Sequence, residues 1–104
     1  MSKSNIKSLI KMLENNPNNP LGRYGLANEY FKEGRFDKVI TELVKYFEIK
    51  EDEGAAYRLL AESYLNLNQK EKAIEAYKKG IEIANKHGHP SMAEEFEEAI
   101  EFID

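Results

Sequence analysis

Residues with catalytic or metal-binding side chains are few in this sequence. The only histidines are His87 and His89, which could supply two metal ligands. A catalytic zinc needs three protein ligands and a structural zinc needs four, and nothing in the pattern completes the set. The 104 residues include no cysteine, which excludes disulfides, thiolate nucleophiles and cysteine-ligated metals. We therefore expect no metal and no cofactor, and we place both histidines in a loop that ends a helix.

The carboxylates and the serines offer no better catalytic arrangement. The pairs Glu94/Glu98 and Glu97/Glu101 have helical spacing, but they are expected on a solvent-facing side where no pocket would raise a pKa. No serine has a base implied nearby, and the six glycines are scattered rather than gathered into a phosphate-binding loop. We therefore expect that the protein is not an enzyme.

Charge and hydropathy narrow the class of protein further. The formal net charge is −4, and an acidic balance argues against a nucleic-acid partner, because phosphates select basic surfaces. No apolar run approaches the roughly 18 residues of a membrane helix. Lys7 and Lys11 interrupt any signal-peptide core. We expect a single cytoplasmic domain without a membrane partner.

An internal repeat organises the elements of the chain. Residues 20–53 aligned without gaps on residues 54–87 share 8 identities in 34 positions, and a period of this length with two helical patterns indicates stacked helical hairpins. The identical pairs are Leu26/Leu60, Ala27/Ala61, Tyr30/Tyr64, Lys38/Lys72, Ile40/Ile74, Lys45/Lys79, Glu48/Glu82 and Ile49/Ile83.

The second copy reads Tyr57-x-x-Leu60-Ala61-x-x-Tyr64 and then Ala73-x-x-x-Tyr77. With these motifs the chain resembles the tetratricopeptide repeats over about residues 5–86, and Pro17 stands where that family closes a repeat. The chain departs from the family pattern at Arg23, which replaces a large aromatic residue, and at Ala27 and Ala61, which replace glycine. The resemblance implies an all-α fold, a right-handed α-solenoid of stacked antiparallel helical hairpins with about six helices. Its parts within the single domain 1–104 are a half-repeat helix at 4–16, repeat one at 20–53, repeat two at 54–87 and a capping helix at 91–103.

Local signals support these boundaries. Gly34 and the turn Asn66-Leu67-Asn68 suit residues with positive φ between the helices of each hairpin. Ser91-Met92-Ala93-Glu94 is typical of a capping box at the start of the last helix. The predicted core comprises Leu26, Tyr30, Ile40, Leu60, Tyr64, Ile74 and Phe96.

The resemblance also implies where a ligand binds, because the first helix of each hairpin in this family lines a concave groove that holds an extended peptide. One subtype grips a terminal carboxylate; Asn28 matches that pattern, but Tyr24, Leu59 and Ala93 do not, so we reject this clamp. Two interpretations of Tyr24 and Phe31 stay open: they anchor a partner, or they pack between helices. The predicted groove residues are Leu21, Tyr24, Asn28, Phe31 and Lys32 from repeat one, with Ala55, Arg58, Glu62, Leu65 and Asn66 from repeat two.

The leading functional hypothesis is a non-catalytic protein–protein interaction module, a scaffold or adaptor whose partner is another protein or a peptide segment. The alternative is a weakly self-assembling structural unit, in which the basic first helix with Lys3, Lys7 and Lys11 meets the acidic last helix of another copy.

Overall fold

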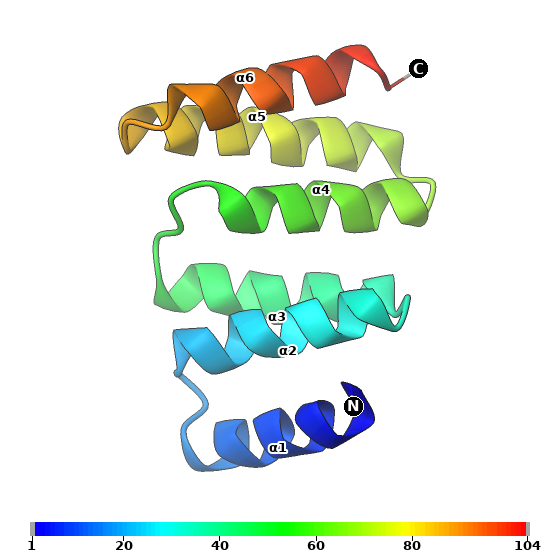
Figure 1. Cartoon of the computed structure of the whole chain (residues 1–104), viewed down its shortest axis with the longest axis vertical. Helices are drawn as coiled ribbons and strands as arrows, with labels where there is room; N and C mark the ends of the chain where they lie inside the picture. The colour runs from blue at the N-terminus through cyan, green and yellow to red at the C-terminus, as the bar shows by residue number, and fades with distance from the viewer. Residues whose placement is uncertain (1, 104) are drawn as a thin grey trace. The chain divides into compact units, whose positions relative to one another are not determined.

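The computed structural model describes residues 2–103, and side chains from residue 5 onward, so the side chain of Lys3 lies outside the described part. Across these residues the structure contains six helices and no strand, which confirms the predicted all-α fold (Figure 1). The helices are α1 (Ser2–Asn15), α2 (Pro20–Lys32), α3 (Phe36–Ile49), α4 (Ala55–Asn66), α5 (Lys70–Lys86) and α6 (Pro90–Glu101).

The helices form two compact units, residues 1–51 with α1 to α3 and residues 52–104 with α4 to α6. In the first unit α2 packs against both α1 and α3, and in the second α5 packs against both α4 and α6 (Figure 1). Each unit therefore holds one complete helical hairpin, α2–α3 or α4–α5, and one additional helix.

The turns inside the two hairpins match the sequence expectation. Gly34 has φ 74° and Asn68, its equivalent 34 residues later, has φ 61°. Glycine adopts this left-handed conformation without steric cost, and asparagine tolerates it better than most residues. A residue with positive φ is thus required at the same position of both repeats, 34 residues apart.

Helix starts depend on different capping groups in the two units. Asn19 Oδ1 accepts the N–H of Gly22 at 3.2 Å, and Pro20 occupies the first turn of α2, where a missing N–H costs nothing. The carboxylate of Asp52 is buried and accepts the N–H groups of Gly54 (2.7 Å) and Ala56 (2.9 Å) at the start of α4. The predicted capping box at Ser91 is wrong, because α6 already begins at Pro90.

The core differs in part from the prediction. Leu26, Tyr30 and Phe96 are buried as expected. Ile40 and Ile74 are only half-buried, because Val39 and Ala73 occupy the fully buried positions and the next residue lies about 100° further around the helix.

Leu60 and Tyr64 are half-buried as well. They pack against the core of the second unit, but they also line an open hollow of about 320 Å³ with Lys72 and Glu75. That core consists of Ala61, Ala73, Ala76, Tyr77 and Phe96.

Arg23, the departure from the family pattern, is part of an ion pair inside the first hairpin. Its Nη1 lies 2.8 Å from Glu42 Oε1, and its Nε donates to the carbonyl oxygen of Pro17 at 3.1 Å. The side chains are 14% and 11% exposed, so the charges are largely removed from water. The equivalent residues of the second hairpin are Tyr57 and Ala76, so one repeat has an aromatic residue facing alanine where the other has an ion pair.

Candidate peptide-binding surface

The predicted groove residues of repeat one lie on α2, and we call Leu21, Tyr24, Asn28, Phe31 and Lys32 the α2 face. Leu21 is 81% exposed, which makes it an accessible apolar side chain near the start of the helix. Lys32 Nζ lies 3.3 Å from Glu29 Oε2, one turn earlier in the same helix, and is largely exposed. The α2 face therefore presents an apolar group at one end and a cation at the other.

Both aromatic residues of the α2 face contact the second helix of their hairpin. The ring of Tyr24 lies 5.3 Å from that of Tyr46 in a tilted arrangement, and the ring of Phe31 lies 5.3 Å from that of Phe36, edge to face. Both side chains remain half-buried rather than enclosed. Tyr24 and Phe31 thus contribute to packing within the hairpin and still present part of their surface.

The predicted residues of repeat two lie on α4, and we call Arg58, Glu62, Leu65 and Asn66 the α4 face. Arg58 forms a bidentate ion pair with Glu95 of α6, with Nε–Oε2 at 2.6 Å and Nη2–Oε1 at 2.8 Å. The guanidinium also lies 5.4 Å from the ring centre of Phe96, within cation–π range. Arg58 is held in one orientation while 35% of its side chain stays exposed.

Glu62 is the electrostatically unusual member of the α4 face. Desolvation by burial raises the pKa of its carboxyl; the charge of Arg58 lowers it, and the charge of Glu95 raises it. The bond from Arg58 lowers the pKa of Glu95. The charge of the guanidinium therefore favours the ionised form of both carboxyls, and its hydrogen bonds are with Glu95.

Leu65 and Asn66 complete the α4 face. Leu65 packs against the core of the second unit. Asn66 Nδ2 donates to the carbonyl oxygen of Glu62 at 2.8 Å, as Asn28 Nδ2 does to that of Tyr24 at 3.2 Å. An asparagine amide has two N–H groups and an accepting oxygen, so one bond to the helix does not exhaust its capacity.

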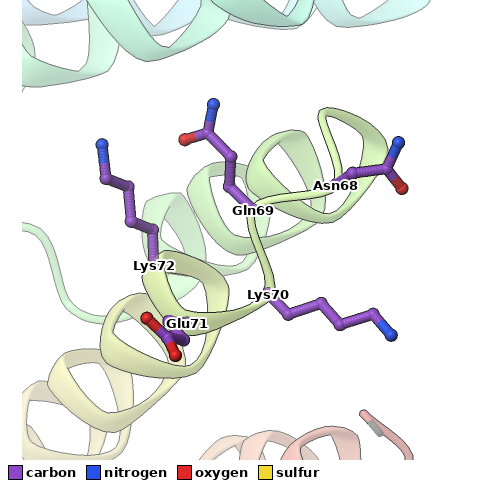
Figure 2. A pocket seen from close by; sticks show the side chains of 5 residues that line it. All are labelled: Asn68, Gln69, Lys70, Glu71 and Lys72. Atoms are coloured by element: carbon purple, nitrogen blue, oxygen red, sulfur yellow. The ribbon is translucent and has the colours of Figure 1, made fainter.

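Two surface hollows lie in the second unit away from its core. One, of about 440 Å³, lies where α6 begins and is lined by Arg58, Glu95, His89 and Met92 among others. The other, of about 410 Å³, surrounds the turn between α4 and α5 (Figure 2). There the side chains of Gln69 and Lys72 point to the same side, away from Lys70, and every lining residue is polar or charged. The first hollow borders the α4 face, and the second has no apolar anchor.

The sequence of the second hairpin matches a known protein family. Residues 55–87 match the family model of the tetratricopeptide repeat, which covers α4 and α5 completely. This match and the six helices of residues 2–103 support a helical repeat of the tetratricopeptide type. Residues 55–87 form a tetratricopeptide repeat. A comparison with curated proteins gave no match.

Tetratricopeptide repeats are protein–protein interaction modules, so the match over residues 55–87 supports the predicted resemblance and a general role in protein binding. No helix within residues 2–103 has both the length and the apolar character to cross a membrane. No group of three or more histidine, aspartate or glutamate side chains in that range is placed to hold a metal ion. His89 Nε2 instead lies 2.8 Å from Glu53 Oε1, and this contact links the start of the second unit to the loop before α6.

Glu95 also belongs to this surface, although the sequence pattern did not predict it. The sequence does contain a signal for Glu95. Met92, Phe96 and Ala99 lie at positions i, i+4 and i+7 of an apolar stripe, and Glu95 occupies position i+3 of the same stripe. A carboxylate in an apolar stripe usually needs a cationic partner. Pairing it with Arg58, 37 residues earlier, requires knowing how α4, α5 and α6 pack together.

Proposed function

We propose that this tetratricopeptide-type protein is a non-catalytic scaffold or adaptor module, and that its α2 and α4 faces bind an extended segment of another protein. The observation that carries the proposal is the family match of residues 55–87, because the first helix of that repeat is α4. Membership of an interaction family supports protein binding in general, and the chemistry of the two faces suggests which segment is bound.

The α2 face favours a ligand with an apolar or aromatic side chain. Leu21 is 81% exposed, and the half-buried rings of Tyr24 and Phe31 lie on the same helix. Rings held by Tyr46 and Phe36 lose little side-chain entropy when a ligand covers them. An apolar residue of the ligand would remove these surfaces from water.

The α4 face favours polar and charged groups of the ligand. Arg58 and Glu62 provide one charge of each sign, and the amides of Asn28 and Asn66 are suited to hydrogen bonds with an extended backbone. Only two hairpins contribute, so the contact area is small and we expect dissociation constants on the order of micromolar or weaker.

The test is a selection of peptides from a random displayed library on the immobilised full chain. Fluorescence anisotropy then measures the affinity of each selected peptide for the variants. We expect Leu21→Ser and Arg58→Gln each to weaken binding about tenfold or more, since central anchors contribute over 1 kcal/mol. The matched controls are Val44→Ser, which removes an exposed apolar side chain from α3, and Arg35→Gln, which removes an exposed arginine.

Normal binding by Leu21→Ser together with loss in Val44→Ser would contradict the assignment to the α2 face. Leu21 is preferred to Tyr24 for this test, because the contact of Tyr24 with Tyr46 mixes binding with stability. A thermal midpoint within a few degrees of the parent for each variant separates the two effects.

A further inference from the structure

The first and last helices expose faces of opposite charge. On α1, Lys7 and Lys11 are exposed and lie one turn apart, with Ile10 38% exposed between them. We call these three residues the α1 outer face. Its apolar neighbours Ile6 and Leu13 are buried, so α1 is fixed in rotation and the lysines point away from the first unit.

On α6 the exposed residues are acidic. Glu94, Glu97, Glu98 and Glu101 are all exposed, and their spacing places them along one side of the helix. Phe102, directly after the helix, is 86% exposed. We call these five residues the α6 outer face. The opposite side of α6 carries Ala93 and Phe96, which are buried.

The two compact units also differ in net charge. Residues 1–51 contain 9 basic and 7 acidic side chains, a net charge of +2, whereas residues 52–104 contain 6 basic and 12 acidic side chains, a net charge of −6. The net charges of the units therefore attract the first unit of one molecule to the second unit of another. The charges of the α1 and α6 outer faces favour the same pairing.

The order of the helices in the repeats indicates which types of helix pack side by side. The complete hairpins are α2–α3 and α4–α5. Helix α1 comes directly before a hairpin, which is the place of the second helix of a repeat. Helix α6 comes directly after a hairpin, which is the place of the first helix of a repeat. Within each hairpin a first helix is followed by a second helix, and α1 of another molecule is a helix of that second type.

We propose that the α6 outer face docks a second copy of this chain, which presents its α1 outer face. Lysines of one molecule then lie against glutamates of the other, and Phe102 and Ile10 provide the apolar contact. The two faces are different, so the contact is heterologous, and its repetition from molecule to molecule builds rings or open chains. The contact is mainly electrostatic, so association weakens as salt shortens the Debye length from about 20 Å at 20 mM to about 4 Å at 0.5 M.

Sedimentation velocity of the full chain over a concentration series tests the proposal. We expect the weight-average sedimentation coefficient to rise with concentration in 20 mM NaCl and to stay at the monomer value in 0.5 M NaCl. A monomer at every concentration up to about 0.5 mM in 20 mM NaCl would overturn the proposal.

A charge exchange tests the two faces directly. Lys7→Glu/Lys11→Glu makes both outer faces acidic, and Glu97→Lys/Glu101→Lys replaces half of the α6 carboxylates with lysines. We expect each variant alone to remain monomeric in 20 mM NaCl. An equimolar mixture should associate, because the unchanged α6 outer face of the first variant then meets the unchanged α1 outer face of the second. A mixture that stays monomeric would contradict the proposed pairing.

Two control variants separate the faces from the net charge. Lys45→Glu/Lys50→Glu and Glu48→Lys/Glu75→Lys change the net charge by the same amounts at exposed positions outside both outer faces. We expect each control variant to associate like the parent in 20 mM NaCl. Equal loss of association in the controls would overturn the assignment to α1 and α6, and circular dichroism verifies that every variant keeps its helices.

Discussion

Gly80 and Gly25 are both helical glycines, yet an added methyl group would have different neighbours at the two positions. At Gly80 a Cβ would lie 2.7 Å from Cε2 of Phe96 and 2.9 Å from Cβ of Tyr57, whereas at Gly25 its nearest neighbour is Leu9 Cδ2 at 3.5 Å. Contacts under 3 Å require the neighbours to move, and Phe96 is fully buried. The glycine at position 80 is therefore needed for close approach rather than for a special backbone angle.

We predict that Gly80→Ala lowers the unfolding free energy by up to about 2 kcal/mol, because overpacking costs about 1–3 kcal/mol and helix propensity returns about 1 kcal/mol. Gly25→Ala should raise it by up to about 1 kcal/mol, since the propensity gain then meets no clash. Urea denaturation of both variants measures the difference. A stabilised Gly80→Ala variant would contradict the packing described around Phe96.

The pKa shifts of Glu62 and Glu95 predict opposite pH dependences. Burial raises the pKa of Glu62, so the folded state binds its proton more readily than the unfolded state, and charging this residue costs stability as pH rises above about 4.5. The bond from Arg58 lowers the pKa of Glu95, so its charge adds stability that is lost as pH falls below about 4.5 towards the folded-state pKa.

We therefore predict that Glu62→Gln stabilises the protein at pH 7 relative to the parent and that this gain shrinks towards pH 4. Glu95→Gln should destabilise it at pH 7, and this loss should also shrink in acid. Urea titrations at pH 4, 5, 6 and 7 give both differences. The same sign for the two variants at pH 7 would contradict either the burial of Glu62 or the bond between Arg58 and Glu95.

At the scale of elements, helix starts depend on particular side chains to different degrees. Asp52 satisfies two N–H groups at the start of α4 with a buried carboxylate, and Asn19 satisfies one at the start of α2. Gln69, the residue before α5, makes no side-chain capping bond. Gly54, between Asp52 and α4, has φ 132°, and a Cβ there would lie 2.5 Å from the sulfur of Met92, so a glycine is required beside this cap.

We predict that Asp52→Ala is the most damaging of three capping changes, with a loss of about 2 kcal/mol, because its hydrogen bonds are charge-assisted and buried. Asn19→Ala should cost about 1 kcal/mol, and Gln69→Ala should cost less than Asn19→Ala. Thermal and urea unfolding of the three variants checks the order. A loss for Gln69→Ala equal to that for Asp52→Ala would show that the capping bonds do not decide these helix starts.

At the scale of the whole molecule, stability and association depend on different parts of the chain. Each unit is held together by contacts between helices that are neighbours in the sequence, as expected for repeats whose stability adds up from intrinsic and nearest-neighbour terms. We expect the unequal charges of the units, +2 and −6, to contribute instead to the proposed association between molecules. The salt dependence of the sedimentation coefficient therefore measures association at the scale of the whole molecule. We expect the charge-exchange variants to change this salt dependence and to have little effect on the free energy of unfolding.

The sequence by itself determined the helices and their turns. A period of 34 residues places Leu26 and Tyr30 on a buried face, and Gly34 and Asn68 adopt the positive φ expected for the two hairpin turns. These features depend on backbone preferences and on the helical period, which a few neighbouring residues are sufficient to specify. The starts of α4 and α6 were harder to predict from the sequence. Asp52 and Pro90 are recognised as the residues that start these helices only when the position of the neighbouring backbone is known.

Only the tertiary structure decided the atomic contacts of the candidate binding surface. Arg58 and Glu95 are 37 residues apart, and their bond depends on the packing of α5 against both α4 and α6. The same packing raises the pKa of Glu62, leaves Leu60 and Tyr64 half-buried at an open hollow, and removes the space for a side chain at Gly80. A periodic pattern specifies which side of a helix is apolar, whereas distances between particular atoms follow from how two helical surfaces fit together.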